Sequence, residues 1–419
     1  MRIVLNNNNL KKKILFFSFL YATLIISFIL NENSTGGAYK DYINQKLISI
    51  EFGKNFFETL LSYDQFSTRH SPILIIFLSF LEKISLNDYL IRFLHLNICL
   101  LLPIFFYKSL KLKYVNLKDD IIYLLTGLIF ISPVFRSLAI WPDSRLLGLT
   151  FFTISIYYFI KYLETKKFKY CLFNLIFYIF ASYLSPNFSL FAIFFLYKFF
   201  ENFKIFSKEF ILILVINFIC SLPAIYYLFI LDVNFLNKSA AIGVGNENNI
   251  FFTNFYNQIL LISSIILFYF LPFIILKIAN FEKEINYKNI VLSVLIFIIC
   301  VINFNYNPNY TGGGIFYKFS DYLFNSNYFF YIFALLGIYL IIQTASISFD
   351  NFLIMLIIFI SNPQITVYHK YYDPLIIIIL FLLLNIKIDF DNKNSRKYFI
   401  FIYIYFSLFL ITNIFKNYV

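Results

Sequence analysis

Long apolar runs separated by short polar segments follow one another from one end of this chain to the other. Runs of about 17–22 residues recur along the chain, and a helix of that length crosses the roughly 30 Å hydrocarbon core of a bilayer. A transmembrane β-barrel would instead show alternating segments of about ten residues. The pattern therefore predicts an all-α, polytopic transmembrane helical bundle.

About 13 spans are expected in a single integral-membrane domain over residues 1–419. The last third could lose two of them to re-entrant or interfacial helices, which leaves about 11–13. The expected spans are Ile14–Leu30, Tyr89–Tyr107, Ile121–Val134, Leu146–Ile160, Tyr170–Leu184, Phe188–Leu196, Phe210–Ile230, Asn257–Leu276, Ile290–Ile302, Tyr328–Ile342, Phe352–Ile360, Pro374–Leu384 and Tyr398–Ile414.

Positive charge orients these spans. Arg2 and three lysines at 11–13 precede the first run, so the positive-inside rule places the N-terminus in the cytoplasm and Asn31–Pro72 outside. With this topology 22 basic and 10 acidic residues lie inside, against 12 of each outside. The formal net charge of +12 thus lies on the inner face, where anionic lipids explain it, and no nucleic-acid partner is expected.

The first outer segment, residues 31–72, is the most polar break near the N-terminus. It leads to Ile73–Leu81, which is apolar but too short to cross a membrane, so residues 73–85 are expected to form an interfacial helix. Five acids and four bases in the outer segment mark it as a candidate site. Asp41 is the expected catalytic residue, and Glu51 is held in reserve. A solvated loop is the alternative.

Composition agrees with a membrane protein, with 60% hydrophobic and 13% charged residues. The four cysteines lie inside apolar runs and are expected to be small buried hydrophobes. The chain contains no Walker A, Gly-x-Gly-x-x-Gly, His-Glu-x-x-His or Cys-x-x-Cys motif, and its three histidines lie in separate segments. The sequence therefore predicts no metal site and no certain cofactor, and it leaves open a requirement for a divalent cation.

The expected outer loops hold further ionisable groups. A carboxylate there could act as a general base on a hydroxyl, and basic groups could hold a lipid phosphate. Each also has a structural interpretation. His70 could cap the interfacial helix, Asp143 could lie in the first turn of its helix, and Lys370 could pair with Asp373. The groups singled out besides Asp41 and Glu51 are Arg69, His70, Arg136, Asp143, His369 and Lys370.

Several short motifs follow one another in a definite order along the chain: Asp41, His70–Leu74, Asp88–Leu94, Ser132–Pro133, Trp141–Leu147 and His369–Pro374. Their order resembles the GT-C superfamily of polyprenyl-phosphate-sugar-dependent glycosyltransferases. The resemblance is to the protein O-mannosyltransferase, lipid A aminoarabinose transferase and dolichyl-phosphate-mannose-type members. Two departures are that Asp41 is followed by Tyr42 instead of a second acid, and that the interfacial helix opens with His-Ser-Pro.

This resemblance implies transfer of a sugar, with inversion, from a polyprenyl-phosphate donor to a lipid, glycan or protein acceptor on the outer side of the membrane. The composition fits a bacterial inner membrane with a periplasmic active site, whereas an endoplasmic-reticulum membrane would give a role to the N-glycosylation sequons in the outer loops. Asp41 would deprotonate the acceptor hydroxyl. Lys370, with Arg69 or Arg136, would bind the donor phosphate, and membrane lipids would surround the chain. The residues expected to position acceptor or loop are Asp143, His70 and His369.

Two other functions stay open. A polymerase or ligase of surface-glycan assembly would carry a large outer loop in its second half, whereas the later outer loops here are modest. A flippase or other transporter would carry ionisable residues in mid-span facing a cavity, and Arg92 and His95 are the hints of this kind.

Overall fold

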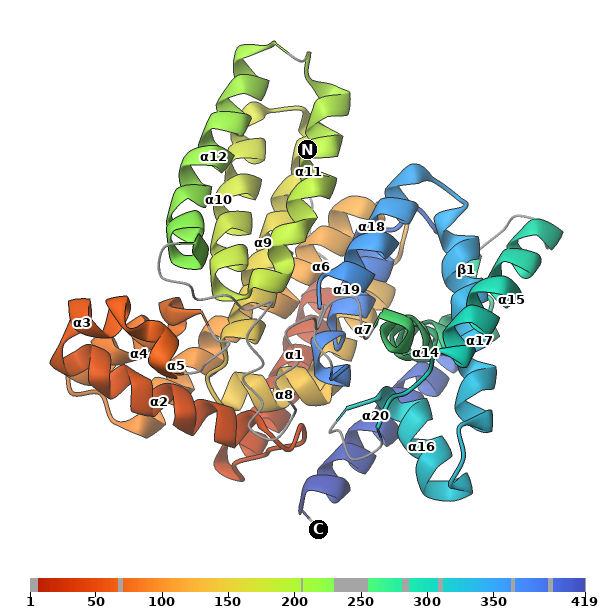
Figure 1. Cartoon of the computed structure of the whole chain (residues 1–419), viewed down its shortest axis with the longest axis horizontal. Coiled ribbons are helices and arrows are strands. Elements are labelled where there is room, and N and C mark those ends of the chain that lie inside the picture. The colour runs from red at the N-terminus through yellow and green to blue at the C-terminus, as the bar shows by residue number, and fades with distance from the viewer. Residues whose placement is uncertain are drawn as a thin grey trace.

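The protein is an all-α helical bundle (Figure 1). The computed structural model describes residues 7–66, 71–204, 206–229, 255–280, 286–307, 312–362, 366–390 and 395–418. Its longer helices are α1 (Asn7–Ile29), α2 (Ala38–Lys54), α4 (Pro72–Lys83), α5 (Asp88–Cys99), α6 (Leu101–Lys113), α7 (Asp119–Ile131), α8 (Pro133–Ile140), α9 (Ser144–Thr165), α10 (Phe168–Leu184), α11 (Phe191–Asn202), α12 (Lys208–Phe229), α14 (Phe255–Ile275), α15 (Tyr287–Ile302), α16 (Gly314–Phe324), α17 (Tyr328–Ala345), α18 (Phe349–Ile360), α19 (Leu375–Leu382) and α20 (Ser395–Tyr418).

Short elements complete the described chain. Strands β1 (Ala279–Asn280) and β2 (Lys387–Ile388) pair antiparallel. The remaining helical turns are α3 (Phe56–Leu61), η1 (Tyr63–Phe66), η2 (Pro186–Leu190) and η3 (His369–Tyr371).

Seven stretches of the described chain are long and apolar enough to cross a membrane. They are α1, α5 with α6, α9, α12, α14, α17 and α20. The bent pair α7 and α8 would make an eighth, and α10, α15 and α18 are apolar but shorter. The expected polytopic helical bundle is therefore confirmed. The count from the sequence was higher because it treated short apolar runs, such as Pro374–Leu384, as full spans.

The expected third span is a broken one. α7 ends at Ile131, and α8 leaves it at an angle of 62°. Ser132 precedes a proline, which favours extended backbone, and Pro133 suits the first turn of a new helix. Ser132 Oγ also accepts a hydrogen bond from Phe135 N (3.0 Å) and so caps α8. The Ser-Pro pair thus turns the chain inside the bundle.

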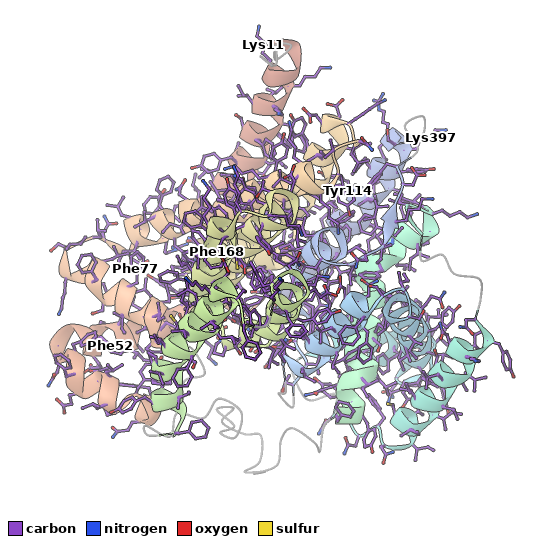
Figure 2. All side chains as sticks on the ribbon, turned by 90° about the horizontal axis from the view of Figure 1, so that it is seen from above. Lys11, Phe52, Phe77, Tyr114, Phe168 and Lys397 are labelled. Carbon is purple, nitrogen blue, oxygen red and sulfur yellow. The ribbon has the colours of Figure 1, made fainter. Side chains whose placement is uncertain are left out.

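The first polar segment is mostly helical, not a loop. α2 packs against α4, and with α3 and α5 these helices form an arm at the left of Figure 1. Phe52 and Phe77, labelled in Figure 2, lie on this arm, apart from Tyr114 and Phe168 in the body of the molecule. Ser71 caps α4 through Ile73 N (3.5 Å). Asp41 therefore sits on a regular helix, which fixes its direction.

The body of the bundle packs in two groups of helices. α9 lies against α6 and α10, and α14 lies against α15, α16 and α17. The eight residues of α19 are all buried, and this helix contacts α6, α9 and α14. α19 therefore joins the two groups, and the segment just before it, 366–374, lies where they meet.

α14 and α17 cross with their backbones in close contact at Gly337. A Cβ added there would lie 2.6 Å from the carbonyl carbon of Ser263. Gly337→Ala is expected to lower the free energy of unfolding by about 1–3 kcal/mol through overpacking. Gly53→Ala in α2 is the control, since its Cβ would meet only Ser79 Oγ at 3.6 Å. Thermal unfolding in detergent should show the loss at Gly337 alone, and equal midpoints for both variants would contradict it.

Candidate active site

Four charged side chains from three distant segments meet where the arm joins the bundle. Arg145 Nη2 lies 2.9 Å from Asp41 Oδ2, and Lys370 Nζ lies 3.2 Å from the same oxygen. Arg145 Nη2 also lies 2.8 Å from Asp143 Oδ2. We call Asp41, Asp143, Arg145 and Lys370 the charged cluster. Three of its members, Asp41, Asp143 and Lys370, were expected from the sequence to belong to the site.

Asp143 holds Arg145 in place. It is the N-cap of α9, and its Oδ1 accepts hydrogen bonds from Arg145 N (2.7 Å) and Nε (3.1 Å). The Asp143 side chain is fully buried, so its charge needs the two-pronged guanidinium pairing that it receives. The sequence suggested a helix-start role for Asp143. The structure shows that this role also aims Arg145 at Asp41.

Asp41 lies in the first turn of α2, after the turn at Gly36, whose φ is +76°. Its side chain is 27% exposed, the most open in the charged cluster. Both cations contact Oδ2, while Oδ1 makes no hydrogen bond within the described part of the chain. Asp41 therefore keeps one oxygen available to accept a proton.

Lys370 belongs to η3, and its ammonium lies 5.1 Å from the centre of the Tyr368 ring. Burial lowers the pKa of Lys370, and the nearby Arg145 charge lowers it further, against the opposing effect of Asp41. The negative charge around Lys370 thus compensates its positive charge only in part. A phosphate that reached it would supply the missing negative charge.

A small, open cavity lies beside Arg145 and Lys370. The lining is mostly apolar, and we call its hydroxyl and amide side chains, those of Ser185, Asn187, Ser361 and Asn362, the amide and hydroxyl wall. The residues lining it are Val134, Leu138, Arg145, Leu146, Leu149, Ser185, Asn187, Phe188, Phe191, Ser361, Asn362, Lys370, Tyr371, Asp373 and Leu375.

Asp373 lines this cavity, but its hydrogen bonds stabilise the fold. Its Oδ2 accepts hydrogen bonds from Ser132 Oγ (2.6 Å) and Val134 N (3.2 Å), at the start of α8. Lys370 pairs with Asp41, so the alternative pairing of Lys370 with Asp373 is not formed. Burial raises the pKa of Asp373 to about 6.

This raised pKa makes stability depend on pH. Between about pH 4 and 6 the folded protein binds a proton at Asp373 that the unfolded chain has lost, so stability falls as pH rises through this window. Asp373→Asn is expected to flatten this fall. Thermal midpoints in detergent from pH 4 to 7 test this, and an unchanged difference between the two proteins across the range would contradict it.

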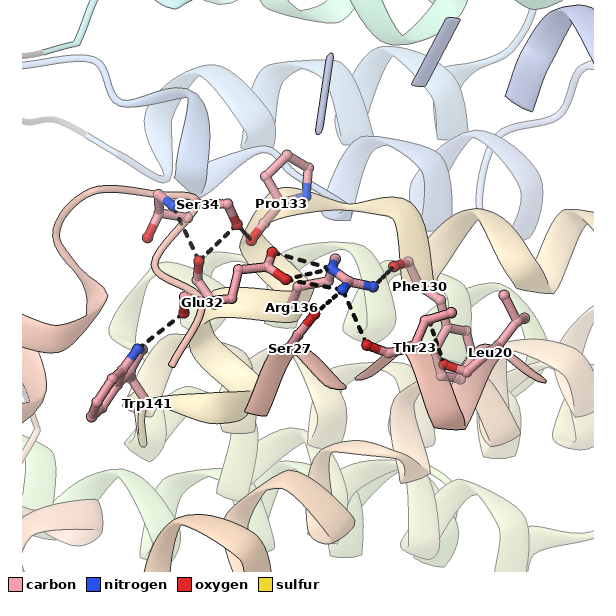
Figure 3. Close-up of polar contacts among 11 residues, drawn as sticks. Leu20, Thr23, Ser27, Glu32, Ser34, Phe130, Pro133, Arg136 and Trp141 are labelled. Carbon is pink, nitrogen blue, oxygen red and sulfur yellow. Dashed lines mark hydrogen bonds and ion pairs between the residues drawn. The ribbon is translucent and has the colours of Figure 1, made fainter. Parts of the chain in front are cut away.

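Arg136, expected to bind the donor phosphate, is enclosed by protein groups (Figure 3). Its Nε lies 3.1 and 3.0 Å from the two carboxylate oxygens of Glu32, and Nη2 lies 2.9 Å from one of them. Further hydrogen bonds reach Ser27 Oγ and the carbonyl oxygens of Thr23 and Phe130. Arg136 does not line the cavity. The structure therefore places it in a buried ion pair, away from the charged cluster.

The remaining expected residues also lie elsewhere. Glu51 pairs with Lys54 (2.8 Å) at an exposed place, about 15 Å along α2 from Asp41 at 1.5 Å per residue. His369 Nε2 shares a hydrogen bond with Tyr269 Oη (2.8 Å), and burial lowers the pKa of His369 to about 3, so the ring is neutral. Arg69 and His70 fall outside the described residues.

Sequence reasoning missed the role of Arg145 and of the amide and hydroxyl wall. Arg145 was part of the Trp141–Leu147 motif, and an arginine two residues after an N-cap aspartate can fold back on it. Asn187 was not among the residues singled out from the sequence, yet it lines the cavity and donates a hydrogen bond from Nδ2 to Asn362 Oδ1. Nothing in the sequence brings positions 187 and 362 together.

Arg92 and His95 bind α8 and do not line the cavity. Arg92 Cζ lies 3.6 Å from the centre of the Trp141 ring, and Arg92 Nε donates to Ile140 O (3.2 Å). His95 Nδ1 lies 3.0 Å from Ala139 O. These polar side chains thus find their partners in α8 and in Trp141, which follows it.

The described residues contain no group of three or more His, Cys, Asp or Glu side chains placed to hold a metal ion. The chain matches no protein-family model, no curated protein and no solved structure. The chemistry of the charged cluster therefore has to be argued from its own geometry.

Proposed function

We propose that the chain is a membrane glycosyltransferase. It transfers a sugar from a polyprenyl-phosphate donor to a hydroxyl acceptor on the extracytoplasmic side of the membrane. The observation that carries the proposal is that Asp41 Oδ2 contacts two cations that line a cavity, while Asp41 Oδ1 makes no hydrogen bond within the described chain. A base and a phosphate-binding pair within one site are what glycosyl transfer from a phosphate requires.

The reaction balances with these groups. Asp41 Oδ1 takes the proton of the acceptor hydroxyl, and the acceptor oxygen forms a bond to the anomeric carbon. The bond between that carbon and the phosphate oxygen breaks, and the polyprenyl phosphate leaves with the electron pair. Lys370 and Arg145 stabilise the charge that appears on the leaving phosphate. Attack from the side opposite the phosphate inverts the anomeric centre.

Donor binding would also change the contacts of Asp41. In the structure, Asp41 Oδ2 is shared by Arg145 and Lys370. A donor phosphate competes for Lys370, whose charge is poorly compensated by its surroundings. Drawing Lys370 toward the phosphate releases Asp41 Oδ2 from one of its two cations, so donor binding loosens the contacts that hold the carboxylate.

The seven apolar stretches support an integral-membrane location, and the positive-inside rule supports a cytoplasmic N-terminus. The composition fits a bacterial inner membrane. Flippase activity is less well supported, because Arg92 and His95 are bound to α8 and do not line the cavity. Polymerase or ligase activity has no specific contact in its favour.

The test is the membrane glycolipid and glycan profile of cells that lack the protein. A sugar that disappears and returns with wild type, but not with Asp41→Asn, supports the transferase and identifies the sugar. Accumulation of an intact lipid-linked glycan on the inner leaflet would establish a flippase instead. Chains shortened to single attached units would establish a polymerase.

A further inference from the structure

The amide and hydroxyl wall of the cavity has hydrogen-bonding capacity that the protein does not use. Asn187 donates Nδ2 to Asn362 Oδ1, which leaves Asn187 Oδ1 with no hydrogen bond within the described chain. Ser185 Oγ likewise makes none there, although both side chains line the cavity. Polar groups placed in a largely apolar cavity without a protein partner are suited to a polar ligand.

This wall is held rigidly. Gln258 Nε2 donates to Asn362 O (3.4 Å), and Asn362 Nδ2 donates to Ser361 Oγ (3.4 Å), so the group that orients Asn187 is itself fixed. On the other side, Gly148 in α9 lets Ser185 approach closely. A Cβ at Gly148 would lie 2.8 Å from Ser185 Cβ. A rigid wall can distinguish ligands by the positions of their polar groups.

The charges of the cavity distinguish ligands as well. Arg145 and Lys370 line it, and Asp373 is the acid that faces them among the described lining residues. Asp373 already accepts hydrogen bonds from Ser132 and Val134 and supports α8. The lining thus carries two positive charges against one negative charge, so a cationic group on a ligand would meet a net positive charge in the cavity.

We infer that Asn187 and Ser185 recognise hydroxyl groups of the donor sugar, and that the cavity selects an uncharged, hydroxylated sugar over one that carries an ammonium group. This inference rests on the proposed function. In the bound donor the phosphate contacts Lys370 and Arg145, and the sugar ring lies between the apolar lining and Asn187. Asn187 Oδ1 accepts a hydrogen bond from a ring hydroxyl, and Ser185 Oγ donates or accepts another.

Binding of three probes to the full chain in lipid nanodiscs tests this. They are undecaprenyl phosphate, undecaprenyl-phosphate glucose and undecaprenyl-phosphate 4-amino-4-deoxyarabinose. The glucose probe is expected to bind about tenfold more tightly than undecaprenyl phosphate, through the added hydrogen bonds. The aminosugar probe should bind no more tightly than undecaprenyl phosphate. Asn187→Ala should remove the gain from glucose.

Asn187→Asp provides a result that misfolding cannot imitate. The side chain keeps its size and gains a negative charge, and the Asn362 amide can turn over to donate to it. The aminosugar probe is expected to gain about tenfold in affinity, while the glucose probe does not gain. Asn202→Asp makes the same change at the exposed end of α11, outside the cavity, and should leave the order of the probes unchanged.

The outcomes separate the two proposals. If undecaprenyl phosphate binds but the glucose unit adds nothing, or Asn187→Asp leaves the order of the probes as in wild type, the sugar-selection inference is overturned and the transferase stands. If none of the three probes binds, both proposals are overturned.

Discussion

Asp41→Asn is expected to reduce sugar transfer by at least a hundredfold while leaving the amount of protein in the membrane unchanged. Asparagine preserves the size of the side chain and can still accept a hydrogen bond. It cannot take up the proton of the acceptor hydroxyl, and general-base catalysis contributes roughly 10²–10⁴ in rate. The loss should appear in kcat, because Lys370 and Arg145 remain to bind the donor phosphate.

Transfer of radiolabelled sugar from membranes that contain equal amounts of each protein measures this effect. Glu51→Gln is the matched control, since it makes the same kind of change on the same helix, at an exposed ion pair about 15 Å away at 1.5 Å per residue. It should retain wild-type activity. Full activity of Asp41→Asn would show that Asp41 is not the general base. Loss of activity only in Glu51→Gln would show that Glu51 is the base instead.

Glu32→Gln is expected to give the largest loss of stability. The side chains of Glu32 and Arg136 are only 6% and 10% exposed, and the change leaves a buried guanidinium without its carboxylate. Removing one partner of a buried ion pair costs about 3–5 kcal/mol. Unfolding by SDS in mixed micelles would measure this loss. The exposed pair of Glu51 with Lys54 should contribute less than about 1 kcal/mol.

The double variant Glu32→Gln with Arg136→Met separates structure from ligand binding. Removing both charges should restore part of the stability lost by Glu32→Gln, because no charge is then buried alone. The affinity for undecaprenyl phosphate should stay at the wild-type level in the folded double variant. If the double variant has normal stability but no longer binds undecaprenyl phosphate, Arg136 binds the donor phosphate after all.

The sequence was sufficient to predict the membrane bundle and part of the charged cluster. Apolar runs identify helices because each must hide its backbone from lipid, and this holds without knowing the partners. Asp41, Asp143 and Lys370 stood out because charge is scarce in this chain. Their convergence was expected only through the resemblance to known transferases, since no local rule brings residues 41 and 370 together.

Two predictions that the structure corrects show what the sequence alone does not reveal. Arg136 has the composition of a phosphate ligand, yet Glu32 satisfies it, and pairing across the fold is not visible in the sequence. Residues 38–54 were treated as a loop because their average polarity is high. They form α2 because Gly36 and Gly37 end the preceding turn and no proline interrupts the segment. Average polarity does not reveal a helix that is only partly buried.

The hydrogen bond between Lys370 and Asp41 joins residues 329 positions apart. During synthesis at roughly 5–20 residues per second, Asp41 emerges from the ribosome tens of seconds before its partner. Until α19 and the segment before it have been inserted, Arg145 is the only cation of the charged cluster available to Asp41. A chain stalled or cut before residue 366 would carry Asp41 without its Lys370 partner. Under the proposed function, biogenesis would therefore delay competence for transfer until nearly the whole protein is in the membrane.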